Sequence, residues 1–522
     1  MIDRPRTRPT SFRAHFRAHV RGTRVAILLL LLLAPAVTMA QEPAAEPSGE
    51  TATEDSIVDQ WRAVLRFGID SEVEELVTTL RDRGDLTLAP ELTEILVGPN
   101  TAGLKLAVVE LFTDLEHHAA GEEVLSVLDN YDINPAELTT AALRYLSNVA
   151  NPVPEGTIEI VREVLDERDR GVVRAALSAL GKLGGAGEAR FLTDYFDETR
   201  DTDLQAETLL ALGDIGSPES YELLARIVQD TGEEALLRQY AADALGRVGD
   251  ERAVPVLSDA ASDTIALVRA YAVNALGAFE TEEAHQVVTA ALRDSFWRTR
   301  VSALQALASS PYDGALEAVI YKAERDPERP VRLEAIGTLG AYPEDRAADA
   351  LAELYRSSRQ PLDVRSAALE ALLEGHPPRA IDEASGVIAE QWEERESRVL
   401  SFTAVALSRY EAGTSEVAAA LSTVYRRLLE HTDYLVRTQA VRGITLNDVR
   451  EFGEALRRFT ADGTPRVLRQ NAAATLEQWG LPTSPPDEDS PPEEEPPADE
   501  DEPAETPAEE ESSDDGSSTE AE

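Results

Sequence analysis

The chain has 522 residues, of which 43% are hydrophobic, so it is long enough to bury a large core. Its 97 acidic residues outnumber its 49 basic residues, and the resulting formal charge of -48 argues against binding to nucleic acid or to an anionic lipid surface. Because the chain contains no cysteine, disulfide bonds, thiolate metal sites and a cysteine nucleophile are excluded.

The N-terminal region has the pattern of a secretory signal peptide. Residues 1–24 contain seven arginines and one acid, an apolar run follows from Val25 to Val37, and small residues lead to Ala40. We therefore expect cleavage after Ala40, which removes residues 1–40. A retained membrane anchor is the alternative, but the apolar run is shorter than the roughly 20 residues that span a bilayer. The pattern predicts export to a bacterial periplasm or secretion, with no transmembrane segment after cleavage and a linker over residues 41–55.

A ten-residue pattern then recurs along most of the chain. It reads apolar, Arg, any, any, Ala, any, any, Ala, Leu, Gly, and it is clearest in the copies that begin at Leu237, Val268 and Val331. Successive copies begin 31 to 37 residues apart, which indicates a repeat architecture. The twelve copies begin at Leu104, Leu138, Val172, Leu204, Leu237, Val268, Thr299, Val331, Val364, Val399, Val436 and Leu468.

Each copy has the apolar period of a buried helix, because its first, fifth and ninth positions fall on one stripe. The small alanines let neighbouring helix axes approach each other closely. A glycine three residues after the copy is expected to cap the helix in the left-handed conformation; these glycines are Gly184, Gly216 and Gly249. A second amphipathic stretch follows each copy, so we expect about twelve or thirteen stacked helix pairs that share one core over residues 56–480.

This pattern resembles the short HEAT-like repeats first named for phycobiliprotein lyases, the PBS lyase type. The resemblance covers residues 56–480 and implies an all-α fold, an alpha-alpha superhelix of the HEAT/armadillo-like kind. The signatures of ankyrin and tetratricopeptide repeats, which have similar periods, are missing.

Three successive units carry an aspartate six residues before the arginine of the copy. In HEAT-like repeats such residues form a ladder that joins the loop to the second helix and to the adjoining unit, so the resemblance implies a structural role. A stripe of arginines that binds phosphates is the alternative, but an acid accompanies each arginine. The residues are Asp263 and Arg269, Asp294 and Arg300, and Asp326 and Arg332.

Candidate catalytic or metal residues are scarce. Deoxyhypusine hydroxylase resembles this architecture but needs several His-Glu pairs as iron ligands, whereas the only histidine cluster here is Glu116-His117-His118. No glycine-rich phosphate loop or Gly-x-Ser-x-Gly motif is present. We therefore predict no enzyme activity, no catalytic residue, no metal and no cofactor. An enzyme or cofactor-binding protein with a lyase-like site in the concave groove stays an alternative.

The second helices of such a solenoid line its concave side, so equivalent repeat positions should form rows. The fourth position gives Tyr240 and Tyr271, and the seventh gives Asp243, Asn274 and Gln305. Tyrosine is frequent in binding hot spots because it buries a large area and keeps a polar tip, so this strip is a predicted protein-binding surface. The alternative is that the rings only pack along the groove.

A second candidate for protein binding is the Trp297-Arg298 pair, in which the guanidinium could stack on the indole ring.

From Leu481 onward the composition changes to proline pairs and acidic runs, with 18 acids and no basic residue over 481–522. Such a segment is expected to be disordered. It could act as a solubilising spacer, or as a contact for cations or a basic partner. The predicted function is an exported, non-enzymatic scaffold that binds another protein through its concave face. A second alternative is an envelope structural component whose acidic tail binds cations or basic polymers.

Overall fold

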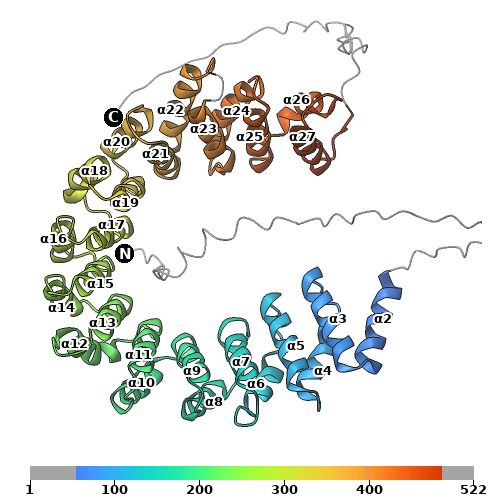
Figure 1. The fold of residues 1–522 in the computed structure, drawn as a ribbon, viewed down its shortest axis with the longest axis vertical. Coiled ribbons are helices and arrows are strands. Elements are labelled where there is room, and N and C mark those ends of the chain that lie inside the picture. Colours follow the sequence, from blue (N-terminus) through green and yellow to red (C-terminus); the bar gives the residue numbers. More distant parts are fainter. Residues whose placement is uncertain (1–53, 395–396, 485–522) are drawn as a thin grey trace, which may run out of the picture. The chain divides into compact units, whose positions relative to one another are not determined.

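The computed structural model describes residues 54–394 and 397–484 (Figure 1). The predicted signal peptide, most of the predicted linker and the acidic tail after Ser484 lie outside the described residues. The described part of the chain forms 26 α-helices and five short 3-10 helices and contains no β-strand. The predicted all-α fold is therefore confirmed. No helix in the described ranges is both long and apolar enough to cross a membrane.

The helices alternate as first and second members of thirteen pairs. The first helices are α2 (Glu54–Phe67), α4 (Ala89–Val97), α6 (Gly121–Leu128), α8 (Thr157–Glu163), α10 (Ala186–Glu198), α12 (Tyr221–Gln229), α14 (Ala253–Ala260), α16 (Glu282–Ala291), α18 (Leu316–Arg325), α20 (Asp345–Arg356), α22 (Pro377–Glu390), α24 (Ser415–Leu429) and α26 (Gly453–Arg457). The 3-10 helices are η1 (Val164–Asp166), η2 (Pro218–Ser220), η3 (Asp313–Ala315), η4 (Arg450–Phe452) and η5 (Arg458–Thr460).

Every copy of the ten-residue pattern lies on a second helix, and in eleven of the twelve it begins at the third residue of that helix. The pattern therefore located these helices to within a residue or two. The second helices are α3 (Asp70–Arg83), α5 (Ala102–Asp114), α7 (Ala136–Asn148), α9 (Arg170–Leu183), α11 (Thr202–Ile215), α13 (Ala235–Val248), α15 (Ala266–Leu276), α17 (Trp297–Ser309), α19 (Arg329–Gly340), α21 (Leu362–Gly375), α23 (Arg398–Arg409), α25 (Tyr434–Leu446) and α27 (Arg466–Gln478).

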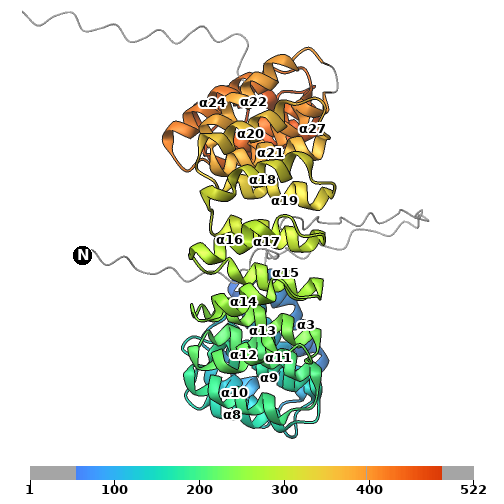
Figure 2. The ribbon, with the colours of Figure 1, turned by 90° about the vertical axis from the view of Figure 1, so that its left-hand side faces the viewer.

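The described residues fall into two compact units that divide within α24, between Val424 and Tyr425. In the first unit, second helices of successive pairs contact each other from α3 to α23. Figure 1 shows α11 to α19 along the inner side of this unit and their partners α10 to α18 along its outer side. Figure 2 shows the pairs α14/α15, α16/α17 and α18/α19 as successive layers. The second unit contains the end of α24 and the helices α25 to α27.

The second helices approach each other closely because the tenth position of one copy lies against the eighth position of the next. In α13, a Cβ atom added to Gly246 would lie 2.9 Å from the Cα atom of Ala275. Real Cβ atoms do not approach backbone atoms this closely, so glycine is required here by packing rather than by backbone conformation. The same contact recurs in Gly181 with Ala211, Gly213 with Ala244, Gly277 with Ala306, and Gly340 with Ala371.

The predicted left-handed caps are present at two of the three glycines. Gly216 has φ 65° and Gly249 has φ 68°, and the N–H of each donates to a carbonyl of the preceding helix. The prediction for Gly184 was wrong, because its backbone is extended with φ -76° and ψ 165°. The next helix, α10, begins at Ala186, so the chain must turn within two residues instead of completing a left-handed cap.

Candidate functional site

A groove of about 350 Å³ lies on the inner face of the first unit, across α9, α11, α13, α15 and α17. Six of the seven residues predicted to bind protein line it, and Trp297 is the exception. The lining residues are Ser178, Glu207, Leu210, Ala211, Asp214, Tyr240, Asp243, Arg247, Leu267, Ala270, Tyr271, Asn274, Arg298, Ser302 and Gln305.

Two tyrosines lie at the middle of this groove. Tyr240 and Tyr271 occupy the fourth position of consecutive copies, and their rings pack edge to face with centroids 6.3 Å apart and an interplanar angle of 87°. Both side chains are half-buried. Burial raises the pKa of the Tyr271 hydroxyl, and Tyr240 and the charge of Asp243 raise it further. The hydroxyl therefore stays protonated at neutral pH and can donate a hydrogen bond to a ligand.

An arginine bridges two carboxylates at one side of the groove. The Arg247 Nη2 donates to Oδ2 of Asp243 at 2.7 Å, and its Nη1 donates to Asp214 on the preceding second helix. Sequence reasoning missed Asp214 and Arg247 because they occupy the eleventh position, one residue beyond the ten-residue pattern. A residue four positions after the seventh lies on the same helix face, so a longer repeat would have included both.

Two amide side chains, Asn274 and Gln305, line the part of the groove nearest α19. Gln305 hydrogen-bonds the carboxyl group of Glu334 on α19, while burial raises the pKa of that carboxyl group above its usual value. Asn274 occupies the equivalent position on α15. The groove thus combines an aromatic pair, amides and carboxylates, which suits recognition of a polypeptide surface.

The Trp297-Arg298 pair lies at the start of α17. The guanidinium carbon of Arg298 lies 5.2 Å from the centroid of the Trp297 ring, within the range of a cation–π contact. Arg298 is exposed and reaches the groove, whereas Trp297 is half-buried and packs near Phe296. The indole ring therefore positions the arginine instead of lining the groove.

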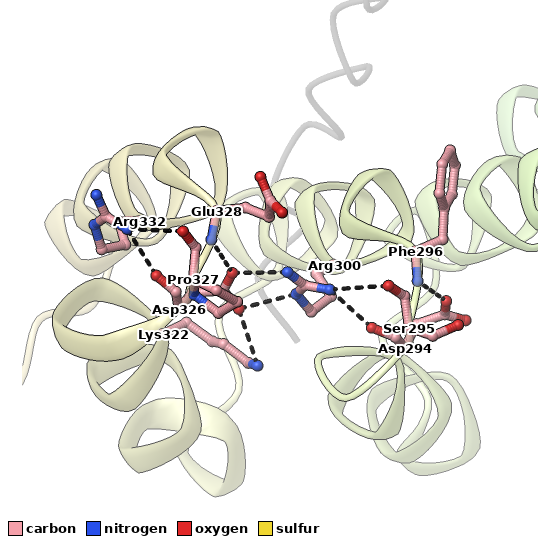
Figure 3. Close-up of polar contacts among 9 residues, drawn as sticks. All are labelled: Asp294, Ser295, Phe296, Arg300, Lys322, Asp326, Pro327, Glu328 and Arg332. Atoms are coloured by element: carbon pink, nitrogen blue, oxygen red, sulfur yellow. Dashed lines mark hydrogen bonds and ion pairs between the residues drawn. The ribbon is translucent and has the colours of Figure 1, made fainter.

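The predicted ladder residues form a continuous series of hydrogen bonds between neighbouring units, part of which is drawn in Figure 3. The carboxylate of each aspartate accepts from the arginine of the preceding unit. For Asp326, the donors are Nε and Nη2 of Arg300, at 2.9 and 2.7 Å. Arg269 binds Asp294 in the same two-bond manner, at 2.7 and 2.9 Å.

The arginine that follows in the same unit reaches the main chain of the aspartate instead. The Nη1 atom of Arg332 donates to the carbonyl of Asp326 at 2.8 Å, and Nη1 of Arg300 donates to that of Asp294 at 3.0 Å. Arg269 donates in the same way to the carbonyl of Asp263, at 2.9 Å. Each ladder arginine therefore fixes the loop before its own helix.

The ladder begins one unit earlier than the sequence indicated. Arg238 of α13 donates to the carboxylate of Asp263 at 2.6 Å and to the carbonyl of Val228 at 2.9 and 3.1 Å. The sequence separation between arginine and aspartate could have revealed this pair. Asp263 follows Arg238 by 25 residues, just as Asp294 follows Arg269 by 25 residues.

The ladder lies in the interior, and Asp326 is its most buried member. Its side chain is fully buried and also accepts from Lys322 Nζ at 3.1 Å and from the backbone N–H of Glu328 at 3.0 Å. Burial by itself would raise the pKa of this carboxyl group, but the hydrogen bonds from Arg300, Glu328 and Lys322 outweigh burial and lower the pKa below its usual value. The carboxylate is therefore ionised throughout the neutral range and holds two helix pairs together.

The histidine cluster does not form a ligand set. His118 Nδ1 lies 2.7 Å from the carbonyl oxygen of Val149, and the carbonyl of His117 accepts a hydrogen bond from the Tyr145 hydroxyl at 2.6 Å. Burial lowers the pKa of His117, and the neighbouring His118 lowers it further. Within the described ranges, no group of three or more His, Asp or Glu side chains could hold a metal ion.

Comparisons with known proteins agree with this architecture. A family model described as "Spirochaete HEAT repeat protein" matches residues 65–475. Deoxyhypusine hydroxylase of Drosophila melanogaster is 26% identical over 115 residues, which are 22% of this chain and 38% of that enzyme. The chain thus spans less than two fifths of that curated relative.

Two solved structures are also similar to the chain. The karyopherin Kap121p, bound to the C-terminus of the phosphatase Cdc14p, aligns with a TM-score of 0.37 at 14% identity, over 83% of this chain and 55% of the karyopherin. The CpcE–CpcF complex of phycocyanin lyase from Nostoc aligns with a TM-score of 0.32 at 20% identity, over 44% of this chain and 94% of that chain. The predicted HEAT-repeat resemblance is confirmed by the family model, whose match covers more than half of the sequence. The chain belongs to the Spirochaete HEAT repeat protein family.

Proposed function

We propose that this protein is an exported, non-enzymatic scaffold that binds another protein in the groove across α9 to α17. The observation that carries the proposal is the edge-to-face pair of Tyr240 and Tyr271 in the middle of that groove. Binding hot spots are enriched in tyrosine and arginine at the centre of an interface, where a partner excludes water. The groove supplies both residue types, since Arg247 and Arg298 flank the tyrosine pair.

The arrangement also favours a polypeptide over a small ligand. The groove is open to the inner face, and it extends over five successive second helices instead of closing around one cavity. Amides and carboxylates beside the rings can pair with the main chain and with polar side chains of a partner. Export rests on the signal-peptide pattern of residues 1–40.

The test is replacement of both tyrosines. We expect Tyr240→Ala combined with Tyr271→Ala to weaken binding of the partner by about 1000-fold, since two hot-spot side chains contribute about 2 kcal/mol each. The partner is first identified by affinity capture with the wild-type protein from the envelope fraction, and its dissociation constant is then measured with purified proteins.

The matched control is Tyr321→Ala. Tyr321 is 55% exposed on the outer helix α18, so its loss should leave the dissociation constant unchanged. Thermal unfolding of all variants must show that the fold is retained. An unchanged affinity in the double variant at native stability would refute the assignment of this groove.

A further inference from the structure

The described part of the second unit is weakly basic, whereas the chain as a whole is strongly acidic. Residues 425–484 contain nine arginines, no lysine and seven acids, a formal charge of +2 in a protein whose total is -48. The segment that follows, residues 485–522, contains 18 acids and no basic residue. In the sequence, a weakly basic segment is therefore followed directly by the most acidic segment of the chain.

The last described residues run alongside α26. The side chain of Leu481 lies against Gly453 at the start of that helix, and the carbonyl of Ser484 accepts a hydrogen bond from Nε of Arg457 at its end, at 3.1 Å. The chain thus passes α26 from its first residue to its last, and the helix is followed at once by Arg458 in η5. The last described residue, Ser484, thus lies at the end of α26, where the loop to α27 begins.

Three arginines lie in or beside this loop, and we call them the arginine edge: Arg437 of α25, which contacts Phe459 of η5, Arg458 of η5 and Arg466 of α27. Arg437 occupies the ladder position of its repeat copy, but where Arg269 and Arg300 bind a carboxylate of the next unit, Arg437 lies over the ring of Phe459, 5.7 Å from its centroid. Its Nε atom is buried and has no hydrogen-bond acceptor among the described residues. An orphaned donor of this kind indicates a missing acceptor.

The other two members of the edge are accessible. Arg458 lies in η5 and Arg466 is the first residue of α27, and both side chains are exposed. Neither forms an ion pair with any residue in the described ranges. The arginine edge therefore combines one arginine at a ladder position with two exposed arginines, and none of the three contacts a carboxylate among the described residues.

We propose that the first acidic run of the tail, Asp487-Glu488-Asp489, docks on the arginine edge and supplies those carboxylates. The run lies three to five residues beyond Ser484, so it can reach about 10 to 18 Å from that residue. Carboxylates and guanidinium groups form charge-assisted, often bidentate hydrogen bonds. A short tether also gives the run a millimolar effective concentration at the edge. The tail thus acts as an intramolecular anionic ligand of the second unit, independently of the groove in the first unit.

The test measures how fast an arginine-directed dicarbonyl reagent modifies Arg458 in the full chain, quantified by peptide mass spectrometry. We expect the variant Asp487→Asn, Glu488→Gln, Asp489→Asn to react about fivefold faster at Arg458 than the wild type, because the docked run covers the guanidinium most of the time. In the wild type, 0.5 M salt should raise the rate to that of the variant, since screening weakens the contact.

A distal variant with the same change in charge separates docking from a general electrostatic effect. Glu509→Gln, Glu510→Gln, Glu511→Gln should leave the Arg458 rate unchanged. Arg442 is exposed on α25 and is the internal control, with equal rates expected in all three chains. Equal Arg458 rates in the wild type and the proximal variant, or equal acceleration by the distal variant, would overturn the proposal.

Discussion

Replacing Asp326 with alanine is expected to destabilise the first unit by about 3–5 kcal/mol, because it leaves buried positive charges without their partner. The side chain of Asp326 is fully buried and accepts hydrogen bonds from Arg300, Lys322 and the N–H of Glu328. Alanine removes the acceptor of all these donors at once and frees the loop that leads into α19. The measurement is the free energy of unfolding from urea titration, with helicity as the probe.

The matched control is Glu317→Ala, which removes a bidentate ion pair with Arg346 in the same unit. The side chains of that pair are 52% exposed for the arginine and 72% for the glutamate, so water can replace the ion pair. The loss of unfolding free energy should therefore be several times smaller than in Asp326→Ala. Comparable losses in the two variants would show that the ladder does not hold the helix pairs together.

Acid should reduce the difference in unfolding free energy between the wild type and Asp326→Ala. The hydrogen bonds lower the pKa of Asp326 in the folded protein, so its contribution is complete above the unfolded value of about 3.9 and is lost as the pH falls through the folded value. Asp294 has its pKa lowered in the same direction, chiefly by the hydrogen bond from Arg269. The gap in unfolding free energy between the two proteins should therefore stay constant near neutral pH and narrow progressively once the pH falls below about 4; a gap that does not narrow in acid would contradict this titration.

The second large effect is expected from Gly246→Ala. Although alanine is the better helix former, its Cβ atom would lie 2.9 Å from the Cα and Cβ atoms of Ala275, so α13 and α15 must separate. We expect a loss of about 1–3 kcal/mol in the free energy of unfolding, which is typical of overpacking.

Gly337→Ala provides the opposite result in the same kind of helix. Gly337 is exposed within α19 and nothing lies within 4 Å of an added Cβ atom, so alanine should stabilise the protein by about 0.5–1 kcal/mol. The contrast isolates the close helix contact from helix propensity. If both variants were stabilised, the proposed glycine–alanine packing would be wrong.

Much of the fold could be predicted because the repeat is visible at the level of single positions. The pattern located twelve second helices, since the period of apolar and small residues reports directly on the buried stripe. The role of the glycine at the tenth position of the pattern was harder to predict from the sequence. In the sequence, Gly246 is only the last position of the repeated pattern; in the structure it lies within α13 and permits close contact with Ala275, which only the stacking of neighbouring helices shows.

The groove was predictable in part for the same reason. Tyr240 and Tyr271 could be placed together because equivalent positions of successive copies form rows. Arg247 and Asp214 were missed because their contact joins eleventh positions of two neighbouring copies, outside the recognised pattern.

In the ladder, the resemblance to HEAT-like repeats implied contacts both within a unit and to the adjoining unit, but the spacing of six residues did not show which group makes which contact. The structure shows that this spacing serves a main-chain carbonyl, as in Arg300 with Asp294, while the carboxylate pairs across units, as in Arg300 with Asp326. Contacts between units depend on helix stacking, which spacing within one unit does not encode.

The most direct test of the inner groove as a protein-binding surface is site-specific photo-cross-linking in intact cells. A photoreactive benzoylphenylalanine in place of Tyr271 should join the protein to one defined partner, and the same group in place of the exposed Tyr321 on α18 should not. A partner cross-linked equally from both positions, or only from Tyr321, would contradict the proposed function.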